Sequence, residues 1–120
     1  TGVVILSEHD MVRAARMVLE GGCQAVLVKG GHVGDGPARD CLIIQGQAGP
    51  IWLESERFDT VDTHGTGCVL SAAITAHLAQ GSDIADACWA AKKLIGRALR
   101  DRVRLGQGVG AVNPLGALRK

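Results

Sequence analysis

Apolar residues near the start of the chain recur at the spacing of one helix face. Ser7 and Asp10 have the spacing of a capping box, with Asp in place of the usual Glu. The apolar positions that follow them lie three and four residues apart: Met11, Ala14, Ala15, Val18 and Leu19. This pattern predicts a helix over residues 8–20, which Gly21-Gly22 would end with a left-handed turn.

Three short apolar runs then predict strands. Residues 25–28, Ala-Val-Leu-Val, form an unbroken apolar run, which is typical of a strand covered on both faces and favours a buried, parallel strand. Residues 33–39 contain two glycines, a proline and an aspartate, and therefore predict a loop. Residues 41–45 and 51–54 are joined by a turn rich in glycine and proline, and we expect them to form a hairpin at the edge of the sheet.

Two further helices are predicted in the second half of the chain. Residues 63–68, Thr-His-Gly-Thr-Gly-Cys, lead into small and apolar side chains that predict a helix ended by Gly81. The next helix has Ser82 as its expected cap and Asp83 near its positive end. Its apolar stripe is Ile84, Ala87, Cys88, Ala91, Leu94, Ile95 and Ala98. The helix could extend to Leu105, and the glycine-rich tail after it is expected to be coil with at most one short strand.

The length and charge of the chain limit the number of domains and the kinds of partner that we expect. Its 120 residues (12.5 kDa) suit one domain, so we expect a single folding unit over residues 1–120. The chain is 47% hydrophobic, and its 13 Lys and Arg balance 12 Asp and Glu, which argues against both a disordered chain and a nucleic-acid binder. No apolar run approaches the roughly 20 residues of a membrane-spanning helix, and no secretory signal is evident. We therefore expect a soluble, cytoplasmic protein with a small-molecule or protein partner.

Cysteine and histidine spacing gives no metal site. The four cysteines lie far apart and form no CxxC pair, so we expect reduced thiols rather than a zinc ribbon or a disulfide framework. Three of the histidines likewise lack metal-ligand spacing: His9, His64 and His77. No metal ligand is assigned from the sequence.

The most specific local feature is the segment 63–68 at the start of a predicted helix. Free backbone N–H groups at a helix start attract anions, and Gly65 and Gly67 would let an oxyanion approach the backbone closely. Cys68 falls in the first turn, where the positive end of the helix dipole favours a thiolate. The residues alone leave a second interpretation equally open, in which Cys68 is a small buried side chain that packs beneath the loop.

Other candidate residues give weaker signals. Lys29 follows the predicted inner strand, at the edge where open α/β sheets place ligands, and neighbouring glycines would leave it uncrowded; it could bind phosphate or simply be solvated. His32 is more typical of a surface loop. Either Lys92 or Lys93 could flank the apolar stripe and reach inward, although a solvated helix face is the commoner arrangement. The mononucleotide P-loop is absent because the sequence contains no Gly-x-x-x-x-Gly-Lys-Ser/Thr. The dinucleotide fingerprint is absent because Leu70 stands where its third glycine would be needed.

Taken together, residues 26–32 (Val-Leu-Val-Lys-Gly-Gly-His), the segment 63–68 and the pair Ala91-Lys92 resemble the C-terminal half of hydroxymethylpyrimidine/phosphomethylpyrimidine kinase. This family belongs to the ribokinase superfamily and to the thiamin pathway, and the similarity covers nearly the whole chain. Most ribokinase-like relatives carry Asp where Cys68 stands. The cysteine therefore favours the pyrimidine kinase over sugar, adenosine and most pyridoxal kinases.

The resemblance implies a fold and an activity. The fold would be α/β, the C-terminal portion of a three-layer α/β/α ribokinase-like architecture. The activity would be ATP-dependent phosphorylation of 4-amino-5-hydroxymethyl-2-methylpyrimidine and its monophosphate, with Mg²⁺ neutralising the phosphates. The full-length protein would be a homodimer, with no nucleic acid or membrane as partner. A pyridoxal-type kinase and a non-catalytic nucleotide-binding fragment are the alternatives.

The resemblance also assigns roles to residues. Gly65, Thr66 and Gly67 would form the anion hole for the transferring phosphoryl group, and Cys68 would be the catalytic base. The nucleotide side of the site would include Lys29, Thr63 and Lys92. Family members are about twice this length, and their N-terminal half supplies the pyrimidine pocket and much of the magnesium environment. We therefore expect the 120-residue chain to be inactive alone, as a truncated product that begins at Thr1 would be.

Overall fold

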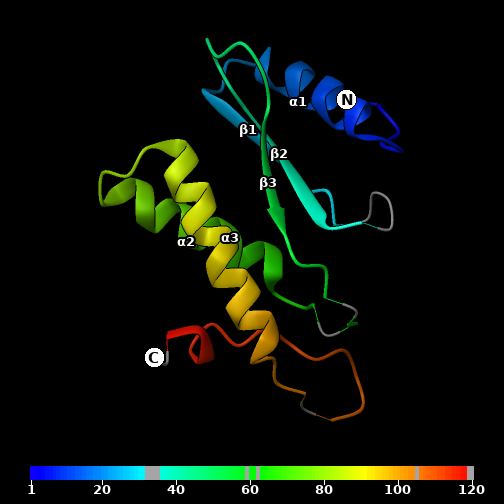
Figure 1. The fold of residues 1–120 in the computed structure, drawn as a ribbon, viewed down its shortest axis with the longest axis vertical. Helices are drawn as coiled ribbons and strands as arrows, with labels where there is room; N and C mark the ends of the chain where they lie inside the picture. The colour runs from blue at the N-terminus through cyan, green and yellow to red at the C-terminus, as the bar shows by residue number, and fades with distance from the viewer. Residues whose placement is uncertain (32–35, 59, 62, 105, 119–120) are drawn as a thin grey trace. The chain divides into compact units, whose positions relative to one another are not determined.

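The computed structural model of the chain describes residues 1–31, 36–58, 60–61, 63–104 and 106–118. The chain divides into two compact units, Thr1–Arg57 and Phe58–Lys120. Their elements, labelled in Figure 1, are α1 (Glu8–Leu19), β1 (Ala25–Val28), β2 (Ala38–Ile44), β3 (Ile51–Ser55), α2 (Thr66–Ala79), α3 (Ile84–Arg100) and the 3-10 helix η1 (Gly116–Leu118). Among the described residues, no helix is both long enough and apolar enough to cross a membrane.

The first helix confirms the capping pattern read from the sequence. Ser7 is the N-cap of α1, and its Oγ accepts a hydrogen bond from the N–H of Asp10 at 3.3 Å. The Ser7 hydroxyl in turn donates to Asp10 Oδ2 at 2.7 Å, which holds the pKa of Asp10 below its ordinary value. Leu19 is the last helical residue, and Gly22 adopts the left-handed conformation (φ +97°) that the stop requires.

The three strands form one antiparallel sheet in the order β1-β2-β3. The predicted hairpin is confirmed, because β2 and β3 pair with Cys41 opposite Trp52. The prediction for β1 is wrong in two respects. The strand is antiparallel to β2, with Val28 opposite Cys41, and its residues are only partly buried because β2 is its one partner among the described strands. The predicted loop was also too long, since β2 already begins at Ala38.

The core of the first unit lies between α1 and one face of this sheet, as Figure 1 shows. Met11 and Ala15 of α1 pack against Cys41 and Ile43 of β2, and all four are buried. Aliphatic, sulfur-containing and small side chains make this contact, as the low aromatic content of 2% requires. The core therefore depends on close approach of helix and sheet.

In the second unit, α2 and α3 lie side by side and are joined by a short turn (Figure 1). Gly81 ends the first of them with φ +91°, as predicted. The N-cap of α3 is Asp83, and not the predicted Ser82; its Oδ1 accepts from the N–H of Asp86 at 2.8 Å. A carboxylate favours the positive helix end more strongly than a hydroxyl does, which explains the one-residue shift.

The last helix is shorter than its apolar pattern predicted. The final helical residue of α3 is Arg100, and Leu105 lies outside the described residues. Beyond the helix, Val103 and Ala111 exchange two backbone hydrogen bonds of 3.0 Å, an isolated bridge where at most one short strand was expected. Val112 and Ala117 then pack against Ala98, so the tail closes the core of this unit.

Candidate functional site

The start of α2 carries the segment that the sequence singled out. Gly65 is the N-cap with φ +86°, a conformation that a side chain would strain, and Thr66, Gly67 and Cys68 are the first three helical residues. The Thr66 N–H donates to Thr63 O at 3.2 Å. In the part of the chain that the structure describes, the N–H groups of Gly67 and Cys68 donate to no protein acceptor. The helix start therefore presents two adjacent free donors.

These donors are open to a ligand from outside. The cap makes no side-chain hydrogen bond, and the first turn carries no acidic residue, so no carboxylate of the helix occupies its positive end. A Cβ added at Gly67 would meet nothing within 4 Å. Cys68 and Thr63 are both exposed. The alternative in which Cys68 packs beneath the loop is therefore wrong for this chain, and its thiol is accessible beside the free N–H groups.

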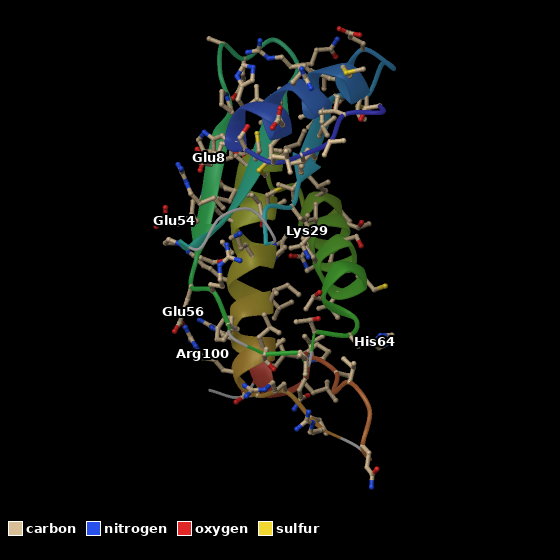
Figure 2. The ribbon with its side chains drawn as sticks, turned by 90° about the vertical axis from the view of Figure 1, so that its right-hand side faces the viewer. Glu8, Lys29, Glu54, Glu56, His64 and Arg100 are labelled. Carbon is tan, nitrogen blue, oxygen red and sulfur yellow. The ribbon has the colours of Figure 1, made fainter. Side chains whose placement is uncertain are left out.

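The loop before α2 is held by the tail of the chain. The His64 N–H donates to Gly110 O at 3.3 Å, and the Val112 N–H donates to His64 O at 3.2 Å, which makes a parallel bridge between His64 and Ala111. Figure 2 labels His64 at this helix start. Val112 Cγ2 would lie 3.6 Å from a Cβ at Gly65, an ordinary contact. This support was not predicted from the sequence, where its one signal is the apolar pair Ala111-Val112 between Gly110 and Asn113-Pro114.

Lys29, labelled in Figure 2, belongs to the other unit and follows β1 directly. Its side chain is exposed. The exposed side chain fits the prediction that Lys29 is uncrowded, but the glycine that follows it is itself closely packed. Gly30 is buried, its N–H donates to Asp40 Oδ1 at 3.0 Å, and an added Cβ would lie 1.9 Å from Arg39 O. Gly31, by contrast, is open, and His32 lies outside the described residues.

The two lysines of α3 differ sharply in exposure. Lys92 is only 7% exposed and sits among the buried residues of the helix, next to Ala91, whereas Lys93 is exposed. The prediction that one of the pair reaches inward is confirmed for Lys92. A buried ammonium is costly unless it is paired, so its position on this face is a specific feature of the fold.

Two ion pairs of the first unit share Arg39. Its guanidinium pairs with Glu8 and, at 3.5 Å, with Glu54, both labelled in Figure 2. It also lies over the ring of Trp52, 4.9 Å from the ring centre. These contacts join α1 to the hairpin and are structural. Within the described residues, no three His, Cys, Asp or Glu side chains are grouped as a metal ion would need.

Comparison with known proteins identifies the family. Residues 1–113 match the model of the phosphomethylpyrimidine kinase family. The hydroxymethylpyrimidine/phosphomethylpyrimidine kinase of Staphylococcus aureus is 41% identical over 122 residues, a match that covers 100% of this chain and 44% of that protein. The protein of the same name from Haemophilus influenzae is 35% identical over 115 residues, 94% of this chain and 43% of its own length.

Solved structures support the same fold. A Bacillus subtilis pyridoxal kinase in complex with ADP superposes with a TM-score of 0.86 at 36% identity, over 93% of this chain and 43% of its own. A Staphylococcus aureus pyridoxal kinase with AMP-PCP and pyridoxal gives 0.89 at 28% identity, over 96% and 42%. The predicted α/β, ribokinase-like fold is thus confirmed, and the chain spans less than half the length of the relatives it matches. The match of its sequence over residues 1–113 shows that the chain belongs to the phosphomethylpyrimidine kinase family.

Proposed function

We propose that the full-length protein containing this chain transfers the γ-phosphoryl group of ATP to hydroxymethylpyrimidine and to its monophosphate, in thiamin synthesis. In this proposal the chain supplies the C-terminal, ATP-binding and anion-hole half. The observation that carries it is the start of α2, where two free N–H groups and an exposed thiol stand side by side on a chain of this family. That the protein is a cytoplasmic homodimer stays a prediction.

The arrangement suits phosphoryl transfer chemically. Backbone N–H groups at the start of α2 would stabilise the negative charge that develops on the transferring phosphoryl group, with Gly65, Thr66 and Gly67 shaping the anion hole. Cys68, in the same turn, would take the proton from the attacking hydroxyl or phosphate oxygen as it bonds to phosphorus. The N–H groups would thus stabilise the charge on the transferring phosphoryl group while the adjacent thiol removes the proton of the attacking oxygen.

Nucleotide contacts are proposed for three other residues. Lys29 is exposed at the end of β1 and would bind phosphates of ATP as a point charge, and Lys92 would line the nucleotide site from α3. Thr63, exposed before the anion hole, would contact the nucleotide from the loop. Among the described residues, no three His, Cys, Asp or Glu side chains lie together to hold Mg²⁺.

A pyridoxal-type kinase is the second candidate. The solved structures named above are pyridoxal kinases, and one of them is 36% identical to this chain. Turnover of the pyrimidine and of pyridoxal by the same intact protein, measured by coupled ADP release, distinguishes the two. Higher kcat/KM for pyridoxal would reverse the assignment of substrate while leaving phosphoryl transfer in place.

The role of Cys68 is tested by Cys68→Ala in the intact protein, with Cys23→Ala as control because both thiols are exposed. Loss of a general base is expected to lower kcat by about 10²–10⁴-fold. ATP affinity should stay within about twofold, and Cys23→Ala should change neither quantity. Near-normal kcat in Cys68→Ala would contradict the proposed base.

The nucleotide contacts are tested by calorimetry with AMP-PCP, which also addresses the non-catalytic alternative. Lys92→Met should weaken binding, whereas Lys93→Met should not, because only Lys92 is directed inward. A protein that binds AMP-PCP but shows no ADP release with either substrate would be a binding module and would refute the kinase proposal.

A further inference from the structure

The backbone that follows Lys29 is held on both sides by charged side chains. Asp40 Oδ1 accepts the N–H of Gly30 at 3.0 Å. Arg57 Nη1 donates to the carbonyl oxygen of Gly31 at 2.6 Å, and its Nε donates to that of Gly36 at 2.7 Å. Two consecutive glycines after the lysine are thus fixed by ionic groups that lie ten and twenty-six residues away along the chain.

Asp40 is an uncommon residue for its position. It lies within β2, directly before the buried Cys41 and Leu42, and is only 5% exposed. Aspartate is disfavoured in strands, and a buried carboxylate is costly unless hydrogen bonds satisfy it. An apolar side chain would suit the strand better but could not accept the Gly30 N–H. We therefore attribute the carboxylate at this position to its hydrogen bond with the turn at Gly30.

The turn has no room to move toward the sheet. A Cβ at Gly30 would lie 1.9 Å from Arg39 O and 2.9 Å from Met11 Cε, so the backbone at residue 30 rests directly on β2 and α1. Any shift away from the sheet would stretch the Asp40 hydrogen bond. The position of the Lys29 backbone is consequently set by Asp40 and Arg57 and by the absence of a side chain at Gly30, while the lysine side chain remains exposed.

We propose that Asp40 and Arg57 are positioning residues that aim the Lys29 ammonium at the phosphates of the nucleotide. This inference rests on the proposed function, in which Lys29 binds ATP phosphates. A flexible lysine loses rotamer freedom on binding, and a fixed backbone beneath it leaves less to lose. The two residues should therefore affect ligands that carry a β- and γ-phosphate, and leave adenosine and the phosphoryl acceptor unaffected.

The test uses four variants of the intact protein: Lys29→Ala, Asp40→Ala, Asp40→Asn and the double variant Lys29→Ala/Asp40→Ala. We expect Lys29→Ala and Asp40→Ala each to weaken AMP-PCP binding by about tenfold, the scale of one charged hydrogen bond. Binding of adenosine and the KM of the acceptor should change less than about twofold. Asp40→Asn keeps an oxygen acceptor for the Gly30 N–H and should recover most of the affinity.

The double variant identifies the route of the effect. If Asp40 acts through Lys29, the double variant should bind AMP-PCP no more weakly than Lys29→Ala alone. Additive losses, or unchanged AMP-PCP affinity in Asp40→Ala, would overturn the positioning role. Unchanged affinity in Lys29→Ala would instead refute the proposed phosphate contact of Lys29 itself, and with it the inference.

Arg57 provides a second test if Asp40→Ala does not fold. Arg57→Lys keeps the positive charge, but one ammonium cannot reproduce the two bonds to Gly31 and Gly36 that the guanidinium makes. AMP-PCP binding should weaken by about threefold, again with adenosine binding unchanged and with no further loss on the Lys29→Ala background. Equal weakening of adenosine and AMP-PCP would show a general structural role and overturn the proposal.

Discussion

Gly30→Ala is expected to destabilise the first unit severely, whereas Gly31→Ala, one residue later, is not. A Cβ at residue 30 would lie 1.9 Å from Arg39 O, a backbone atom that no side-chain rotation can move. An ordinary contact requires the turn and β2 to separate by about 1.5 Å. Such a shift would also break the 3.0 Å hydrogen bond between the Gly30 N–H and Asp40.

The expected cost follows from these two effects. Overpacking against a fixed neighbour costs about 1–3 kcal/mol. Loss of a hydrogen bond to a buried carboxylate costs a further 1.5–3 kcal/mol or so. The free energy of unfolding should therefore fall by about 4 kcal/mol, a large share of the roughly 5–15 kcal/mol of a typical domain.

Gly31→Ala is the matched control. A Cβ at Gly31 meets nothing within 4 Å, and Gly31 is not among the glycines with positive φ. Alanine there should change stability by less than about 1 kcal/mol, and the smaller entropy of its unfolded chain could make the change favourable.

Urea unfolding of the intact protein measures the difference. Trp52 lies in β3 of the affected unit, so its fluorescence in a Trp89→Phe background reports that unit alone. With m near 1–3 kcal/mol/M, the midpoint of Gly30→Ala should fall by roughly 2 M. Similar midpoints for Gly30→Ala and Gly31→Ala would refute the reasoning, because the two glycines would then not differ in packing.

Three further predictions concern the core and the thiols. Met11→Ala should lower the free energy of unfolding by about 2–5 kcal/mol because the Met11 side chain is fully buried. Met17→Ala, on the exposed face of the same helix, should cost under about 1 kcal/mol. Urea unfolding compares the two variants, and equal losses would contradict the place of Met11 in the core. Iodoacetamide should label Cys23 and Cys68 in the folded protein and Cys41 only after unfolding, as mass spectrometry would show; labelling of folded Cys41 would contradict its burial. Burial, and to a smaller extent the negative charge of Glu8, raises the pKa of the Cys41 thiol above its ordinary value of 9.0. The contribution of the protonated thiol to the free energy of unfolding is therefore complete below about pH 9 and is lost as the pH rises further. Cys41→Ala should reduce this alkaline loss, and an unchanged pH profile of unfolding would contradict the assignment.

Local signals in the sequence predicted the helices and the start of α2 well. The capping pair Ser7 and Asp10, the stops at Gly22 and Gly81, and the position of Cys68 in a first helical turn depend only on residues within a few positions of each other. Such short-range hydrogen bonds and left-handed turns have direct sequence signatures. The start of α2 could therefore be identified before its surroundings were known.

Non-local pairing could not be predicted in the same way. A four-residue apolar run such as Ala25–Val28 has no feature that specifies the direction of its neighbour, and it proved antiparallel to β2. The bridge between His64 and Ala111 and the hydrogen bond between Gly30 and Asp40 likewise join residues without a shared motif. Asp40 drew no prediction because it falls between the predicted loop 33–39 and the predicted strand 41–45, and its role as acceptor depends on a glycine ten residues away.

The apolar side chains of α2 affect both the packing of this helix and the electrostatics of the N–H groups at its start. The helix carries small and apolar side chains of its own on every face, a pattern typical of a helix that is buried all round. Its one buried residue, however, is Leu70, and Leu78 is 42% exposed. The chain spans less than half the length of its relatives, and its described residues leave most of α2 partly buried or exposed. N–H donors at a helix start stabilise charge strongly only where water is excluded, since bulk water weakens the interaction severalfold. A cover over the sides of α2 would both bury its apolar surface and lower the dielectric around Gly67 and Cys68. Such a cover would therefore serve both the packing of this helix and the proposed anion hole at its start.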